Sequence, residues 1–462
     1  GVGAGTPGHD NVFGVNTFDK LLQGENHIEQ LDTKAKEDML ARNIVEIQKA
    51  DGLTKRVPVQ STSQCIQLAS ILRPADLVSQ YGIPKSLVEG MDAASIAAVA
   101  AGLDALKQSG LVSGSVENGW GNWRLPEAMA DSTGVLYATS FPALDAAVKE
   151  VSRFHTAPKD GSYEFDRKLL FRLLVLANAQ LAQIIGAKGP NAQVNATCAG
   201  TTVAINMAQD WITSGKCQRV IVVAGDIASS EHLLPWIGSG FRALGAATLA
   251  STVAEGAVPF DKRRNGMLLG GGAVGLVLEA QSSTIQRSFK PSTQVRLVAS
   301  QASNSAFHGA SIDKEHLAQE LNRFLQTIEA QHGVTRAMIA AQGVYYSHET
   351  GTHATPSKSC AFSEIYALRS AFGEAGLKSL VIANTKGYMG HPMGVSFEDV
   401  VAVEGLKRGM IPPVVNFRFH DENLSSTPLR LSQGGAYPDV KYALRFAAGF
   451  GSQVAFTLYS SD

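Results

Sequence analysis

The sequence contains no run of 18 apolar residues, so we predict no membrane span. It also has no excess of either charge, because 40 Lys and Arg residues face 41 Asp and Glu residues, and the net charge at pH 7 is −1. Such a balance creates no broad electrostatic field. Nucleic acid and anionic membrane surfaces are therefore not expected partners.

Cysteine is scarce, with four residues in 462: Cys65, Cys198, Cys217 and Cys360. They are too few and too scattered for a disulfide framework or a zinc-binding pattern. A reducing compartment is expected, which means the cytoplasm, and a plastid fits the same composition. The chain opens at Gly1 without Met or a signal peptide, which suggests a processed or excised piece of a longer protein.

What the chain does have is the composition of a large folded core, with 45% hydrophobic and 18% charged residues. Both halves repeat a pattern of strand, loop and helix, although no residue-level repeat is visible. The polar stretch 33–62 is expected to be a surface insertion. We predict strands at 134–139, 193–196, 219–224, 273–278, 342–346, 380–384, 442–447 and 454–459, and helices at 201–212, 312–331 and 397–408, with a long, largely buried helix at 167–185.

Cys198 lies on the turn between one predicted strand and the helix that follows, with Gly200 just behind it. A helix start provides backbone N–H groups and the positive end of the helix dipole, which favours thiolate over thiol. The residue is well placed to attack a carbonyl group. A buried, inert cysteine on a turn is the alternative interpretation of the residue taken alone.

Two loop histidines in the second half each follow a predicted strand. His348 lies in the run SHETGTHATPSKS, and His391 lies with Lys386 in the run TKGYMGHPMGVS. The carboxyl ends of strands in open α/β sheets are where a site collects, so these three residues and Cys198 are expected to converge. Each histidine alone could equally be a solvated surface group.

These runs together resemble the β-ketoacyl synthase family, and the likeness is strongest to ketosynthase domains of type I polyketide synthases. The resemblance joins the run around Cys198, PFDKRRNGMLLGGGAVGLVLE, HETGT, NTKGYMGH, LKRGMIPPVVNF and AGFGSQVAF, in the family's order. Spacings of 150 residues from Cys198 to His348 and 43 from His348 to His391 are comparable to the family's.

The resemblance implies a thiolase fold, an α/β fold in which two pseudo-repeated halves form a five-layered αβαβα core. We expect residues 1–281 to carry the nucleophile and residues 282–462 to carry the two histidines and the lysine. It also implies a homodimer, acting alone or excised from a multidomain synthase. No bound cofactor or metal is expected, because the acyl and malonyl substrates arrive on the phosphopantetheine of an acyl carrier protein.

The same resemblance implies residue roles in polyketide or fatty acid synthesis. Cys198 would accept the acyl group, and the backbone N–H groups of Cys198 and Phe450 would form the oxyanion hole. His348 and His391 would stabilise the enolate formed when a malonyl-type extender loses CO₂, and Lys386 would orient His348 and add positive charge.

Three residues depart from the family pattern. Glu349 stands where the family has glycine, and we expect its carboxylate to point outward, since the following Thr-Gly-Thr is kept. Asn265 and Gly271 stand where the family has acidic residues. These departures favour, as an alternative function, an altered homologue that only transfers, hydrolyses or decarboxylates acyl groups.

Other classes fit less well. An enzyme of the chalcone-synthase type would need Asn in place of His391, and a thiolase would need a second cysteine near the C-terminal glycine loop. A non-enzymatic subunit would have lost Cys198. A cysteine peptidase would leave the second histidine unexplained.

Overall fold

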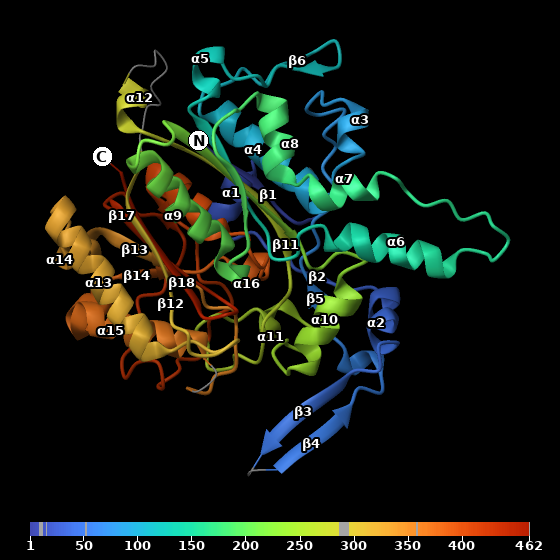
Figure 1. Ribbon diagram of the computed structural model, residues 1–462. Coiled ribbons are helices and arrows are strands. Elements are labelled where there is room, and N and C mark those ends of the chain that lie inside the picture. The colour runs from blue at the N-terminus through green and yellow to red at the C-terminus, as the bar shows by residue number, and fades with distance from the viewer. Residues whose placement is uncertain (9–12, 15, 51–52, 286–294, 357–358, 462) are drawn as a thin grey trace.

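The computed structural model describes residues 1–8, 13–14, 16–50, 53–285, 295–356 and 359–461, and its centre is a pair of five-stranded sheets (Figure 1). The first sheet has the order β1-β11-β10-β8-β9, and the second has the order β12-β18-β17-β13-β14. The first is built from β1 (Val2–Gly5), β8 (Thr133–Ala138), β9 (Asn191–Val194), β10 (Arg219–Ile227) and β11 (Gly271–Glu279). The second is built from β12 (Val295–Asn304), β13 (Gly343–Tyr346), β14 (Val381–Ala383), β17 (Tyr442–Gly449) and β18 (Gln453–Ser461).

The two sheets repeat one topology. In the first, β8 pairs in parallel with β9 and β10, and β11 pairs antiparallel with β10 and β1. In the second, β13 pairs in parallel with β14 and β17, and β18 pairs antiparallel with β17 and β12. The strands therefore correspond one to one in chain order and in direction. This correspondence confirms the predicted pseudo-repeat of the thiolase-like fold.

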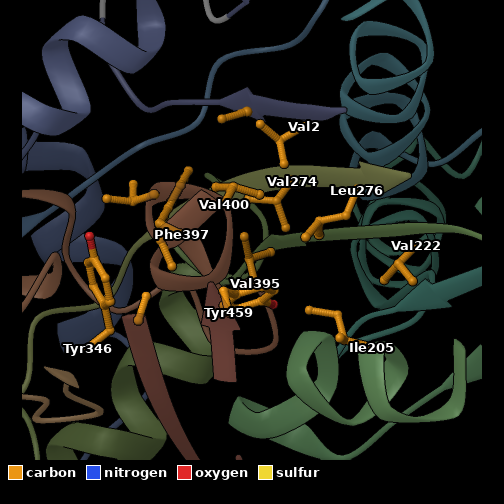
Figure 2. Packing of buried hydrophobic residues seen from close by; sticks show 14 of the residues in the cluster. Val2, Ile205, Val222, Val274, Leu276, Tyr346, Val395, Phe397, Val400 and Tyr459 are labelled. Carbon is orange, nitrogen blue, oxygen red and sulfur yellow. The ribbon is translucent and has the colours of Figure 1, made fainter. Parts of the chain in front are cut away.

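Two helices lie between the sheets and form the middle layer. Helix α9 (Gly200–Thr213) contacts β10 of the first sheet and β12 and β18 of the second, and α17 (Phe397–Arg408) contacts strands of both sheets in the same way. Figure 2 shows their apolar side chains meeting those of the strands, among them Ile205, Val222 and Val400. Each half thus completes its core against the other half.

The outer layers cover the remaining faces of the sheets. Helix α4 (Ala93–Gln108) packs on β1, β10 and β11, and α8 (Ala177–Ile185) packs on β8 and β9. The alanine-rich α4 lies so close that a Cβ atom at Gly275 would stand 2.3 Å from the carbonyl oxygen of Ala101. Helices α13 (Lys314–His332), α14 (Arg336–Gln342) and α15 (Cys360–Ser379) form the opposite outer layer. The result is the five-layered arrangement that the sequence predicts.

The predicted helix at 167–185 is wrong as one buried element. The structure has two helices, α7 (Leu169–Leu174) and α8, separated by Val175 and Leu176 outside helical geometry. Leu170 and Leu174 of α7 are 59% and 72% exposed, so only α8 belongs to the core. The prediction assumed that apolar residues are buried. It fails for α7, because the apolar surface of this helix is exposed in a single chain.

The stretch 33–62 is a surface insertion, as expected. It forms α2 (Thr33–Leu40) and the hairpin of β3 (Val45–Ala50) and β4 (Leu53–Pro58), which projects from the body (Figure 1).

No described helix is long and apolar enough to cross a membrane. Two further helices of ten or more residues are α6 (Leu144–Thr156) and α10 (Leu234–Ala243). The remaining helices and strands are shorter: α1 (Thr17–Gln23), β2 (Glu29–Gln30), β5 (Leu68–Ala69), α3 (Lys85–Val88), β6 (Val116–Glu117), β7 (Trp120–Gly121), α5 (Glu127–Ala130), α11 (Val253–Gly256), α12 (Gln281–Ile285), α16 (Lys386–Met389), β15 (Met410–Ile411) and β16 (Gly435–Ala436).

Candidate active site

Cys198 lies in a sharp turn between β9 and α9. The turn is a single 3₁₀ segment, Thr197–Ala199, and Thr197 has a left-handed backbone with φ of +48°, which is uncommon for a β-branched residue. The Thr197 hydroxyl donates a hydrogen bond of 3.0 Å to the carbonyl oxygen of Phe450. This bond ties the cysteine turn to the loop between β17 and β18, in the other half of the chain.

The thiol is enclosed rather than open to water. Cys198 is 6% exposed and belongs to an apolar cluster with Phe241, Met393 and Phe450. Burial raises the pKa of the Cys198 thiol to about 12, although the positive charge of Lys386 and the backbone N–H groups of Phe450 and Cys198 itself act in the opposite direction. The expectation that the helix start favours the thiolate in the free protein is therefore wrong, because desolvation outweighs the dipole.

His348 and His391 come together, as the sequence predicts. Their ring centroids are 5.8 Å apart and the rings are nearly perpendicular, at 87°. Both side chains are buried. Burial lowers the pKa of His391 to about 3 and that of His348 well below its ordinary value, and the charges of Lys386 and Arg445 add to the effect. Both imidazoles are therefore neutral near pH 7 and can donate a hydrogen bond without carrying charge.

The backbone of His391 is held directly against the extended segment that precedes β11. Its N–H donates to the carbonyl oxygen of Leu268 at 2.7 Å, and its own carbonyl oxygen accepts from the N–H of Gly270 at 3.0 Å. Gly270 makes room for this loop, since a Cβ atom there would stand 3.0 Å from the carbonyl oxygen of Met389, and Gly272 makes room for α17, since a Cβ atom there would stand 2.6 Å from the ring of Phe397. The triple glycine of the sequence thus serves the close approach of another element.

Lys386 is part of a buried ion network that the sequence did not reveal. Its ammonium group donates to Oε1 of Glu398, and Nη2 of Arg445 lies 3.3 Å from Oε2 of the same carboxylate. Burial alone would raise the pKa of Glu398, but Arg445 and Lys386 outweigh burial and lower it to about 2. Lys386 therefore bonds to Glu398, and its influence on His348 is electrostatic. Glu398 and Arg445 could not be singled out, because an acidic residue in a first helical turn and an arginine in a strand are commonplace.

The expectation for Glu349 is wrong, because its side chain is fully buried. The carboxylate accepts hydrogen bonds from the N–H groups of Gly351 at 2.9 Å and Ala361 at 2.7 Å, and Nε of Arg264 lies 3.6 Å away. Burial raises its pKa to about 7, the charge of Arg264 opposes that shift, and nearby Glu364 adds to it. One of these donors, the N–H of Ala361, belongs to the first turn of α15, where backbone N–H groups have no partner within the helix.

Glu349 also belongs to the group of described residues that brings potential metal ligands together. Its carboxylate, the Cys360 thiol and the Glu364 carboxylate offer ligand atoms within 4.8 Å of one another. All three already have partners, since the Cys360 thiol donates to Glu364, which also accepts from the hydroxyl of Tyr345 and the N–H of His348. These contacts explain the group as a hydrogen-bonded support beneath His348.

The other two departures are well packed. The side-chain amide of Asn265 donates to the carbonyl oxygens of Glu255 and Arg263, each at 3.1 Å. A Cβ atom at Gly271 would stand 2.9 Å from Cβ of Leu72, so the backbone leaves little room for a side chain there.

Matching sheets around two central helices, with a thiol at the start of one of them, define the class of thiolase-like enzymes. The family model for the N-terminal domain of beta-ketoacyl synthases matches residues 1–284, which is more than half of the chain. The chain therefore belongs to the beta-ketoacyl synthase family, and the ketosynthase class expected from the sequence is confirmed.

Three relatives illustrate the likeness. A 3-oxoacyl-[acyl-carrier-protein] synthase 2 of Vibrio cholerae is 26% identical over 386 residues, covering 82% of this chain and 81% of its own length. A crystal structure of a beta-ketoacyl synthase from Burkholderia phymatum matches with a TM-score of 0.74 at 18% identity, covering 100% of this chain and 98% of that one. A type II polyketide ketosynthase, solved with its acyl-carrier protein and bound to a hexaketide, matches with a TM-score of 0.69 at 17% identity over 100% and 97% of the two chains. The solved structures support the fold.

Proposed function

We propose that Cys198 accepts an acyl group from a carrier-bound thioester and that the enzyme then joins this group to a malonyl-type extender by decarboxylative condensation. The observation that carries the proposal is the pair of neutral, buried imidazoles of His348 and His391, whose ring centroids are 5.8 Å apart. The charge of Lys386 acts on both rings and also on the Cys198 thiol, just before a central helix. Two neutral N–H donors suit an oxygen that becomes negative during the reaction and then returns to neutral.

The first half-reaction exchanges one thioester for another. The sulfur of Cys198 attacks the acyl carbonyl carbon, the bond to the phosphopantetheine sulfur breaks, and the thiol proton passes to that leaving sulfur. Because the Cys198 thiol is neutral at rest, its proton leaves only as the sulfur attacks. An imidazole with a pKa of about 3 is too weak a base to hold that proton, so it passes directly to the departing sulfur. The N–H groups of Cys198 and Phe450, which act on the thiolate, are proposed to hold the oxyanion of the tetrahedral intermediate.

The second half-reaction forms the carbon–carbon bond. The malonyl carboxylate leaves as CO₂, its electron pair forms an enolate, and the enolate carbon attacks the acyl-cysteine. His348 and His391 donate to the enolate oxygen, while Lys386 supplies positive charge from behind without transferring a proton. The cysteine leaves as a thiolate and takes up one proton, which restores the resting thiol.

An acyl carrier protein is the proposed partner. The support is the related ketosynthase solved with its carrier protein, together with the carrier protein named in the Vibrio cholerae relative. The proposed substrates are therefore acyl and malonyl groups on phosphopantetheine, in fatty acid or polyketide synthesis, in the cytoplasm. We also propose that the chain divides between residues 281 and 282 into an N-terminal half with Cys198 and a C-terminal half with both histidines and Lys386.

A homodimer is proposed for the surface formed by α6, α7 and the edge strand β9. Strand β9 has no neighbour on its outer side among the described strands, and an unpaired edge is a ready site for pairing with another chain. The same region exposes an apolar surface that a single chain leaves open: Val151, Phe154, Phe165, Leu170, Phe171, Leu173 and Leu174.

The test separates the two half-reactions by intact-mass measurement. Wild-type protein should gain the mass of an acyl group from an acyl thioester and should release a β-keto product once malonyl carrier protein is added. Cys198→Ala should not be acylated, and His391→Ala should be acylated but should release no product. Acylation without any condensed product in the wild type would instead support the altered homologue that only transfers, hydrolyses or decarboxylates acyl thioesters.

A further inference from the structure

Asp226, at the carboxyl end of β10, is a buried carboxylate that the mechanism above does not use. It is 1% exposed, and no described Lys, Arg or His lies within 4 Å of it. Its oxygens accept hydrogen bonds from the hydroxyl of Thr139 at 2.7 Å, the N–H of Ser140 at 3.0 Å and the N–H of Gly394 at 2.8 Å. The carboxylate therefore joins the ends of β8 and β10 to the loop that carries His391.

Gly394 follows His391 by three residues, and both of its backbone polar groups form hydrogen bonds. Its N–H donates to Asp226, and its carbonyl oxygen accepts from the N–H of Thr201 at 3.0 Å and from the Thr201 hydroxyl at 2.6 Å. Thr201 in turn follows Cys198 by three residues, at the start of α9. A single residue, Gly394, thus links the loop of His391 to the start of α9, just after Cys198.

The contact is close enough to be intolerant of side chains. A Cβ atom at Gly394 would stand 2.8 Å from Oδ2 of Asp226 and 3.1 Å from the carbonyl oxygen of Thr197. The preceding residue, Met393, has a left-handed backbone with φ of +50°. A non-glycine residue in this conformation is held by its surroundings, and Asp226 and Thr201 are the surroundings that hold this one.

Burying the Asp226 carboxylate is energetically unfavourable, so we expect the residue to have a role that offsets this cost. Burial raises the pKa of Asp226 to about 6, and the three donors oppose that shift. Its negative charge also raises the pKa of the Cys198 thiol, in opposition to Lys386. A neutral residue at this position would avoid both effects but could not accept all of these hydrogen bonds.

We infer that Asp226 is a positioning residue for the condensation step, which holds the His391 loop against the Cys198 turn through Gly394. The inference rests on the proposed function and deepens it: a residue of the first half, Asp226, would hold a histidine of the second half, His391, in place. It predicts that loss of the carboxylate disturbs the step that needs His391 more than the step that needs Cys198. Small displacements of a donor from its reacting oxygen are costly, since 1 Å can reduce a rate about 100-fold.

The test is Asp226→Asn, with the rate of acyl loading and the rate of condensation of pre-acylated enzyme measured separately. In the variant, an NH₂ group replaces one carboxylate oxygen, so a hydrogen-bond donor would face N–H donors in place of an acceptor. We expect loading to stay within about 3-fold of wild type and condensation to fall about 10-fold or more. Equal losses in both steps, or unchanged condensation, would overturn the inference.

Two further variants keep the test decisive. Thr201→Val is nearly isosteric and removes a hydrogen bond on the other side of Gly394, so it should show the same selective loss even if Asp226→Asn fails to fold. Asp92→Asn is the matched control, because Asp92 is buried like Asp226 but accepts from the N–H of Ser95 at the start of α4 instead of the N–H of Gly394 in the His391 loop. It should change the thermal midpoint without changing the ratio of the two rates, and a selective loss of condensation there would overturn the inference. A wild-type enzyme that forms no condensed product would refute the proposed function itself, which is a different outcome from equal losses in the variants.

Discussion

The buried carboxylate of Glu349 should make the stability of this protein depend on pH, and the dependence can be isolated. Its pKa is raised to about 7 from the ordinary value of 4.5, because burial disfavours the charged form. The folded protein therefore holds this proton more tightly than the unfolded chain does. The stabilisation is fully present below about pH 4.5 and is lost as the pH rises through about 7.

The magnitude follows from the two pKa values. The difference between about 7 and 4.5 corresponds to about 3 kcal/mol in the free energy of unfolding. About 2 to 3 kcal/mol of this should be lost between pH 5 and pH 8. Glu349→Gln cannot ionise, so the free energy of unfolding of the variant should fall less than that of wild type over this range. An overall offset of about 1 to 3 kcal/mol is also expected, because the amide replaces the acceptor for the N–H of Ala361 by a donor.

The assay is urea unfolding of both proteins at four values between pH 5 and pH 8. Other buried carboxylates such as Asp226 titrate in the same range, but they contribute equally to both proteins and cancel in the difference. Glu404→Gln is a matched control, because Lys407 and Arg408 keep the pKa of Glu404 below its ordinary value despite burial. Its curve should run parallel to that of wild type. Parallel curves for wild type and Glu349→Gln would refute the reasoning and would mean that Arg264 keeps Glu349 ionised throughout.

Two more changes test the packing behind the site. Arg445→Met should lower the free energy of unfolding by about 3 to 5 kcal/mol, because Glu398 and Asp399 lose their buried cation; a loss below about 1 kcal/mol in urea unfolding would contradict the ion network. Gly272→Ala should lower it by about 1 to 3 kcal/mol, because the new Cβ atom would press on Phe397. Gly240→Ala in α10, where no atom lies within 4 Å of the new Cβ, is the control and should be neutral or stabilising, and equal losses for both alanines would count against the close approach.

The sequence predicted the fold well because its strongest signals are those of the fold. Apolar strands and the helices after them lie where they were expected: the strand predicted at 219–224 is part of β10, and the helix predicted at 201–212 is α9 to within a residue at each end. The turn that carries Cys198 was also predictable, since a thiol between a strand and a helix has few other local conformations. The open surface of α7 was not, because hydrophobicity alone does not say whether a chain buries a residue by itself or with a partner.

The sequence indicates candidate reactive residues for the site but not the residues that support them. Cys198, His348, His391 and Lys386 stand out because their side chains carry chemistry. Asp226 does not, since its role depends on the N–H of Gly394, which is 168 residues away in the chain. Contacts of this range exist only after both sheets have formed, and local sequence patterns carry no information about them.

The electrostatic design of the site places full charges behind it and neutral groups at its front. Lys386, Glu398, Arg445 and Asp399 are all buried and lie within one network of opposite charges, so their cost of desolvation is met by one another. Lys386 and Arg445 nevertheless lower the pKa of both histidines, and Lys386 also opposes the rise in the pKa of the thiol. The resting site therefore combines an uncharged thiol with two uncharged imidazoles, and all three side chains are buried. The thiol and the imidazoles carry no charge at rest, so the hydrogen-bond donors and the buried cations act most strongly when a substrate oxygen becomes negative. An interaction that strengthens as this charge develops stabilises the transition state more than the ground state.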